Sequence, residues 1–180
     1  QNVFSFQFEN GSKNSRLELT KKLFKSDKII IDSKGIKKTI PCRIYMPDNI
    51  SLKEPVPLVV FLHGAGERGN NNISQLNHFP IRWVHDGHLG KRHKAVVLAV
   101  QCEQASWWTP IKKNEKEEWV SNLNVGLTDS MRAVEKKIKE LSFDARIDKK
   151  RIYLTGLSMG GFGSWDLLRR HPDWFAAVSP

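Results

Sequence analysis

The sequence has few cysteines and no long apolar run, and each shortage excludes a class of protein. Only two of its 180 residues are cysteine, Cys42 and Cys102, which is too few for a scaffold built on disulfides. Both stand at strand or strand-end positions, and we predict two buried free thiols. No apolar run approaches the roughly 18 residues that a membrane-spanning helix needs, so we expect no membrane span.

The chain also lacks a metal-ligand spacing and a nucleic-acid-binding signature. His85 and His88 lie three positions apart, but no third ligand completes a recognisable pattern. The formal net charge is +10, yet the lysines that produce it are scattered, as on an ordinary solvated surface. We therefore expect no metal, no cofactor and no nucleic-acid partner, although an acidic partner stays open on charge alone.

Short apolar runs alternate with helical patterns along the chain, which indicates an α/β fold with a mainly parallel sheet. Expected strands are an edge strand within residues 1–12, a hairpin formed by 28–33 and 38–47, buried strands at 57–64, 95–102 and 151–156, and the start of another at 175–180. Expected helices lie within residues 78–87, 123–141 and 162–170. With no internal repeat and no low-complexity segment, residues 1–180 are predicted to form one domain.

The stretch RIYLTGLSMGGFGSW, residues 151–165, places a serine between two glycines where an apolar run ends and a helical pattern begins. A serine hydroxyl is a weak nucleophile and must be presented openly to a base and a substrate. A sharp strand-to-helix turn does this, and it leaves no room for side chains two residues before and after the serine. Gly156 and Gly160 occupy those positions, so we predict that Ser158 is a nucleophile on such an elbow.

A second glycine-rich stretch, HGAG at residues 63–66, follows an earlier apolar run. Acyl transfer builds negative charge on the carbonyl oxygen, and preorganised backbone N–H donors lower the barrier. We expect one donor to be the N–H of Met159, just after the nucleophile, and the other to be the N–H of Ala65. Gly64 and Gly66 would let this loop approach the substrate.

Three neighbouring polar residues are expected to support that loop. His63 is an attractive candidate for a catalytic base, but the expected chain order is serine, acid, then histidine, so we assign it a role in holding the loop. Glu67 and Arg68 are expected to brace the loop, by pairing with each other or with neighbouring backbone.

Together, FLHGAGERG, AVQCEQASWWT and RIYLTGLSMGGFGSWDLLRRHPDWFAAVSP resemble α/β-hydrolase-fold esterases over roughly residues 38–180. The chain is most similar to the phospholipase/carboxylesterase and polyhydroxybutyrate-depolymerase-like group, which is close to feruloyl and acetyl-xylan esterases. The resemblance implies a sheet with helices on both faces. It also implies that Trp107 and Trp108 flank a substrate pocket, with ordinary packing of a partly buried loop as the alternative.

The partners of the proposed nucleophile are not evident. In this fold the acid and the histidine follow the serine in the chain, and only Asp166, His171 and Asp173 stand there. At about 1.5 Å per helical residue, His171 would lie about 20 Å from Ser158. We therefore expect a domain truncated after the nucleophile-bearing strand and helix, with the acid and histidine of the C-terminal part absent. An exposed sheet edge would then favour self-association.

Two function classes follow from these residues. The first is a serine carboxylic-ester hydrolase that forms an acyl-enzyme on Ser158 and acts on small or carbohydrate-linked esters, including polysaccharide esters. The second is a catalytically incomplete, hydrolase-like module that binds carbohydrate or a protein partner. The chain begins with Gln1 and not with methionine, so either a signal peptide has been removed or the sequence starts within a longer chain. We expect a secreted or periplasmic location.

Overall fold

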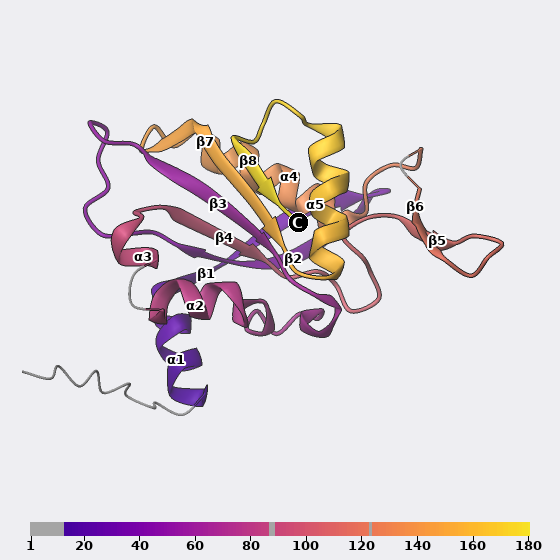
Figure 1. Ribbon diagram of the computed structural model, residues 1–180, viewed down its shortest axis with the longest axis horizontal. Coiled ribbons are helices and arrows are strands. Elements are labelled where there is room, and N and C mark those ends of the chain that lie inside the picture. Colours follow the sequence, from indigo (N-terminus) through magenta and orange to yellow (C-terminus); the bar gives the residue numbers. More distant parts are fainter. Residues whose placement is uncertain (1–12, 87–88, 123) are drawn as a thin grey trace, which may run out of the picture.

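The computed structural model describes residues 13–86, 89–122 and 124–180, and its centre is a twisted mixed sheet (Figure 1). Within these residues the sheet has six strands in the order β1-β2-β4-β3-β7-β8. They are β1 (Phe24–Ser33), β2 (Ile36–Tyr45), β3 (Val56–Leu62), β4 (Val96–Val100), β7 (Ile147–Gly156) and β8 (Ala177–Ser179). β1 pairs antiparallel with β2, and β2 antiparallel with β4, whereas β4, β3, β7 and β8 run parallel.

Helices cover both faces of this sheet. The remaining elements are α1 (Lys13–Leu23), η1 (Ala65–Glu67), η2 (Ser74–Leu76), α2 (Phe79–His85), α3 (Leu89–Arg92), α4 (Asp129–Ser142), α5 (Met159–Arg170) and a small hairpin of β5 (Ile111–Lys113) and β6 (Trp119–Ser121). Because side chains alternate along a strand, Val97 joins a cluster with Trp83 of α2, whereas Leu98 joins the larger cluster that contains Met131 of α4 and Leu167 of α5. The predicted two-sided burial of the central strands is confirmed.

The structure confirms the expected hairpin, the three central strands and a helix after Ser158, and it corrects the starts of two helices. α5 begins at Met159, directly after the serine, and not at residue 162. α4 begins at Asp129, not near residue 123, because the Thr128 side chain caps it by accepting a hydrogen bond from the Met131 N–H at 3.2 Å. Helix α1 and the β5–β6 hairpin were not anticipated. The edge strand expected within residues 1–12 lies outside the described residues.

The register of β3 against β7 positions the site. Phe61 pairs with Thr155 and Leu62 with Gly156, so these two parallel strands end side by side. The loop after β3 and the turn after β7 therefore emerge together at the carboxyl edge of the sheet, where ligands bind in open α/β folds.

Candidate active site

Ser158 lies on a strained turn between β7 and α5. Its backbone has φ 53° and ψ −111°, a combination that is rare for a residue with a β-carbon, and the residue is exposed. The turn is fixed on both sides: the Leu157 N–H donates to Leu62 O at 3.0 Å, and the Gly161 N–H donates to Ser158 O at 2.8 Å. The geometry is that of the predicted elbow, with the serine held outward at the helix N-terminus.

The two glycines of the elbow are sterically required. A β-carbon on Gly156 would lie 2.1 Å from Gly160 O, and one on Gly160 would lie 1.9 Å from Leu62 O. Both distances are far below van der Waals contact, and the atoms met are backbone atoms that cannot move aside. The chain can therefore make this turn only with glycine at both positions.

Both expected oxyanion donors stand at the first position of a helical turn. Met159 is the first residue of α5, and Ala65 is the first residue of η1. The N–H groups of a first turn have no acceptor within their own helix, so they are available to a substrate oxygen. A β-carbon on Gly64 would lie 3.8 Å from Ser158 Cβ, which places the Ala65 loop directly against the nucleophile. By contrast, a β-carbon on Gly66 would meet nothing within 4 Å.

His63 is buried and ties the loop to the end of β4. The Cys102 N–H donates to His63 Nε2 at 2.9 Å, so this nitrogen is the acceptor and Nδ1 carries the proton. Nδ1 in turn donates to Gly64 O at 2.7 Å. Burial lowers the pKa of His63, which keeps the ring neutral. Since both nitrogens are engaged with backbone, the geometry favours the expected loop-holding role over that of a catalytic base.

The hydrogen bond from His63 acts on the peptide group that carries the Ala65 N–H. Gly64 O accepts from His63 Nδ1 at 2.7 Å and from the Glu67 N–H at 3.3 Å. Two donors on this carbonyl fix the plane of the Gly64–Ala65 peptide and polarise its N–H, which is the donor that the oxyanion would need.

The two tryptophans of the sequence motif have different positions. Trp108 has no exposed surface, its Nε1–H donates to His63 O at 2.9 Å, and its β-carbon lies against Gly163 of α5. The pocket expectation is therefore corrected for Trp108, because a side chain enclosed in the core does not line an open pocket. Trp107 is half-buried and lies under the Arg68 guanidinium at 5.3 Å, so it stays a candidate pocket residue.

Two further side chains hold the loop after β3. Arg68 Nε donates to Ala65 O at 3.0 Å, and its NH1 donates to Ser106 O at 3.2 Å. Gln101, which the sequence analysis did not single out, is fully buried and donates through Nε2 to Glu67 O at 3.0 Å. In the sequence it is the one polar residue of the apolar run predicted as a strand at 95–102, and that was the signal that could have identified it.

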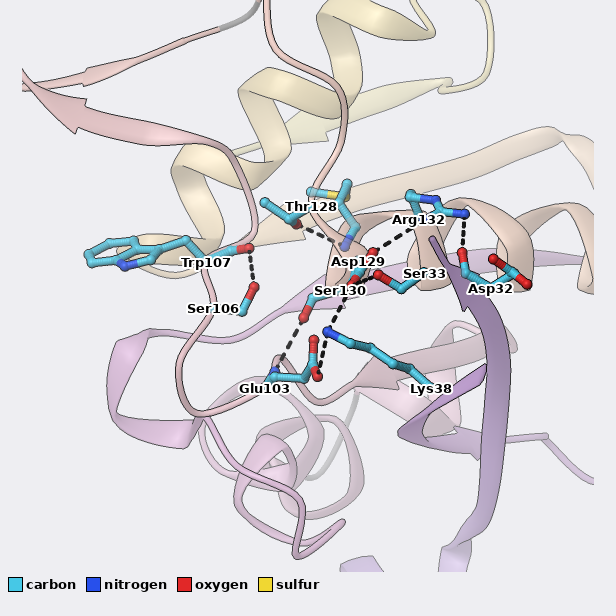
Figure 2. Close-up of polar contacts among 11 residues, drawn as sticks. Asp32, Ser33, Lys38, Glu103, Ser106, Trp107, Thr128, Asp129, Ser130 and Arg132 are labelled. Atoms are coloured by element: carbon cyan, nitrogen blue, oxygen red, sulfur yellow. Dashed lines mark hydrogen bonds and ion pairs between the residues drawn. The ribbon is translucent and has the colours of Figure 1, made fainter. Parts of the chain in front are cut away.

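A network of charges holds the segment that leads to Trp107. Lys38 of β2 forms ion pairs with Asp129 at 2.8 Å and with Glu103 at 3.5 Å (Figure 2). The Glu103 N–H also donates to Ser130 Oγ at 3.2 Å. The hydrogen bond from Lys38 holds the pKa of the Asp129 carboxyl below its usual range. The network thus joins the β1–β2 hairpin, the loop after β4 and the start of α4.

Asp166 and His171, which follow Ser158 in the chain, form their contacts away from the serine. Asp166 pairs with Arg170 at 2.8 Å on α5, and His171 Nε2 is hydrogen-bonded to Glu135 Oε1 of α4. Within residues 13–86, 89–122 and 124–180 no histidine forms a hydrogen bond with Ser158. The expectation that neither Asp166 nor His171 reaches the serine agrees with these contacts.

Cys42 and Cys102 are both buried and free, as predicted. Burial raises the pKa of Cys42 to about 12 and that of Cys102 to about 11, so neither is a reactive thiolate at neutral pH. In the part of the chain that the structure describes, no three histidine, cysteine or carboxylate side chains gather as a metal site. No helix in this part is long and apolar enough to cross a membrane.

The fold and the sequence both resemble known esterases. A solved thermostable esterase is 34% identical, with a TM-score of 0.74 over 89% of this chain and 41% of its own. The protein named "Putative esterase NocK" of Nocardia uniformis subsp. tsuyamanensis is 29% identical over 133 residues, which are 74% of this chain and 34% of that protein. An acetyl xylan esterase from Aspergillus awamori, 15% identical with a TM-score of 0.58, shares the fold over 86% of this chain and 50% of its own.

The chain thus has the α/β-hydrolase fold, and the resemblance to esterases of this fold is confirmed. No family model matches the sequence. The chain spans 34% of the length of NocK and 41% of the length of the thermostable esterase.

Proposed function

We propose that the protein is a serine carboxylic-ester hydrolase that acts through an acyl-enzyme on Ser158. The observation that carries this proposal is the strained, exposed Ser158 packed against the Gly64–Ala65 loop, with the Ala65 and Met159 N–H groups at two helix starts. This arrangement presents a nucleophile beside two donors, as acyl transfer requires.

In the proposed reaction, Ser158 Oγ attacks the ester carbonyl carbon as its proton passes to a base. The carbonyl oxygen takes up the electron pair and is stabilised by the Ala65 and Met159 N–H groups. Collapse of the tetrahedral intermediate releases the alcohol, which takes up the proton, and leaves the acyl group on Ser158. Water then cleaves this acyl-enzyme and regenerates the serine. The base and its acid partner would come from residues that the structure does not place beside Ser158.

We propose small or carbohydrate-linked esters as substrates. The fold shared with an acetyl xylan esterase and a ferulic acid esterase supports carbohydrate-linked esters as a class to test, and the exposed position of Ser158 is compatible with a large alcohol group. The alternative is a hydrolase-like module that binds carbohydrate or a protein without turnover. It is favoured by the engagement of Asp166 and His171 away from the serine.

Hydrolysis of p-nitrophenyl acetate by the purified natural protein tests the proposal. We expect turnover that the Ser158→Ala variant reduces by at least a thousandfold, since the nucleophile is then lost. Ser142→Ala, at the far end of α4, is the matched control and should retain full activity. Equal rates for wild type and Ser158→Ala, together with stoichiometric carbohydrate binding, would favour the binding module.

A further inference from the structure

A carboxylate lies beside the candidate nucleophile and has no role in the reaction described above. A β-carbon built on Gly64 would lie 3.1 Å from Glu67 Oε2 and 3.8 Å from Ser158 Cβ. The two groups therefore border the same space beside Gly64, and Glu67 Oε2 and Ser158 Cβ lie no more than about 7 Å apart. The Glu67 side chain keeps 14% of its surface exposed, so a substrate held at Ser158 could reach it.

One oxygen of this carboxylate is held and the other is not. His78 Nε2 lies 3.3 Å from Glu67 Oε1. Among the described residues no hydrogen bond is made to Oε2, which is the carboxylate oxygen that lies beside Gly64. A carboxylate oxygen in this state can only accept, so it offers a hydrogen-bond acceptor to whatever occupies the site.

The backbone of His78 is strained in the same way as that of Ser158. His78 has φ 65° and ψ −107°, close to the φ 53° and ψ −111° of the nucleophile. Strain of this kind persists where the surrounding structure fixes it, and it concentrates at functional sites. Here the strained turn begins α2 and points the imidazole at Glu67.

Arg68 does not neutralise Glu67, although the two residues are adjacent in the chain. The guanidinium donates to Ala65 O and Ser106 O and lies over the Trp107 ring. Arg68 contacts neighbouring backbone, as one of the two expected pairings has it. The Glu67 carboxylate contacts neither Arg68 nor backbone, and pairs with His78. The free oxygen of Glu67 is thus left for a ligand.

We propose that Glu67 is a specificity-determining residue that binds a hydrogen-bond donor of the substrate, a hydroxyl or an ammonium group close to the scissile ester. His78 is then a positioning residue that holds Oε1 and turns Oε2 toward the substrate. A site that hydrogen-bonds a substrate hydroxyl discriminates strongly against an analogue that lacks it, because the site group is then left without its partner. This inference rests on the proposed esterase function.

The test compares matched esters on the purified natural protein. Methyl butyrate, methyl 3-hydroxybutyrate and methyl 3-aminobutyrate present a hydrogen, a hydroxyl or an ammonium group at one carbon of the acyl part. Propyl acetate and glycerol monoacetate make the same comparison on the alcohol part. For each series, the ratio of kcat/KM for the donor-bearing ester to that for the apolar ester measures the preference.

We expect wild type to prefer at least one donor-bearing ester by about tenfold or more. Glu67→Leu should reduce that preference to about one, with most of the change in KM. Glu67→Gln keeps an acceptor but loses the charge, so it should retain part of a hydroxyl preference and lose an ammonium preference. His78→Leu should reduce the preference by a smaller factor, and His78→Gln, which keeps a donor, should restore it. Glu54→Gln, exposed before the opposite end of β3, is the matched control and should change nothing.

The outcomes separate this inference from the proposed function. Turnover of the apolar esters that depends on Ser158, combined with no donor preference or with a preference that both Glu67 variants retain, would overturn the role of Glu67 alone. Absence of Ser158-dependent turnover of every ester would overturn both proposals. If Glu67→Leu fails to fold, the comparison of Glu67→Gln with wild type decides the role.

Discussion

Two regions of this chain are held by different forces. The elbow at Ser158 and the loop after β3 are fixed by steric fit and by buried, mostly neutral hydrogen bonds, such as those of His63 with Gly64 O and the Cys102 N–H. The region around Lys38, by contrast, is fixed by ion pairs of partly exposed side chains (Figure 2). Buried groups cannot exchange a lost partner for water, whereas exposed charges can.

The difference follows from what each region has to do. A nucleophile and its oxyanion donors must hold their positions closely, and packing of backbone against backbone permits little movement. The charged network only needs to keep the hairpin, the loop after β4 and the start of α4 in contact. We therefore expect substitutions at the elbow and the loop after β3 to lower the free energy of unfolding strongly, and substitutions in the charged network around Lys38 to lower it only slightly.

The largest effect is expected for Gly160→Ala. Its new methyl group would lie 1.9 Å from Leu62 O, so strand and helix would have to separate, at a cost of more than about 4 kcal/mol. Gly66→Ala, in the adjacent loop, is the matched control and should change stability by less than about 1 kcal/mol, since nothing lies within 4 Å. Urea unfolding measures both. Equal stability of the two variants would contradict the steric account of the elbow.

Trp108→Ala should cause the next largest loss of stability. It removes the largest fully buried side chain and leaves His63 O without its donor, which together cost about 3 to 4 kcal/mol. Trp107→Ala should cost less than about 2 kcal/mol, because this ring is half-buried. Thermal and urea unfolding of both variants check the order. A reversed order would mean that Trp107, not Trp108, supports the loop.

His63→Leu should show a pH-dependent loss of stability. The variant leaves the buried Cys102 N–H unpaired and removes the shorter of the two hydrogen bonds to Gly64 O, which costs about 2 kcal/mol at pH 8. Burial lowers the pKa of His63 in the folded protein, so below about pH 6.5 the unfolded wild-type chain takes up a proton that the folded one does not. The free energy of unfolding of wild type therefore falls as the pH drops below this value. The variant has no imidazole at this position, so its free energy of unfolding lacks this dependence on pH.

The free energy difference between the two proteins should thus narrow between pH 8 and pH 5, as measured by urea unfolding at each pH. A difference that stays constant or widens toward acid would show that His63 is not held neutral by burial.

The smallest effect is expected for Lys38→Met. Loss of its ion pairs with Asp129 and Glu103 should cost less than about 1 kcal/mol at pH 7, because the side chains are partly exposed. Lys38 lowers the pKa of Asp129, so this contribution is present above the ordinary carboxyl pKa of about 3.9 and is lost as the pH falls below it. The stabilities of wild type and variant should therefore converge as the pH falls below this value. A cost above 2 kcal/mol would remove the contrast between the two regions.

Local patterns in the sequence predicted the features that are themselves local. Gly156, Ser158 and Gly160 encode the elbow within five residues, and the apolar runs encode the central strands, because burial on both faces demands apolar side chains throughout. The start of α4 was placed too early, since the apolar period continues past the residue that caps the helix, Thr128. Helix α1 was missed because it buries little and has a weak apolar face.

The contacts that the sequence could not show join residues far apart in the chain. Trp108 packs on His63 and Gly163, and Gln101 reaches the loop after β3. No spacing of residue types in the sequence encodes these contacts. They form because the register of β3 against β4 and β7 places the residues side by side.

Labelling of the natural protein with a fluorophosphonate probe, followed by peptide mapping, shows whether Ser158 is an activated nucleophile. We expect one adduct, on Ser158, and none in the Ser158→Ala variant. An unlabelled protein, or an adduct on a different serine, would contradict the assignment of Ser158 as an activated nucleophile.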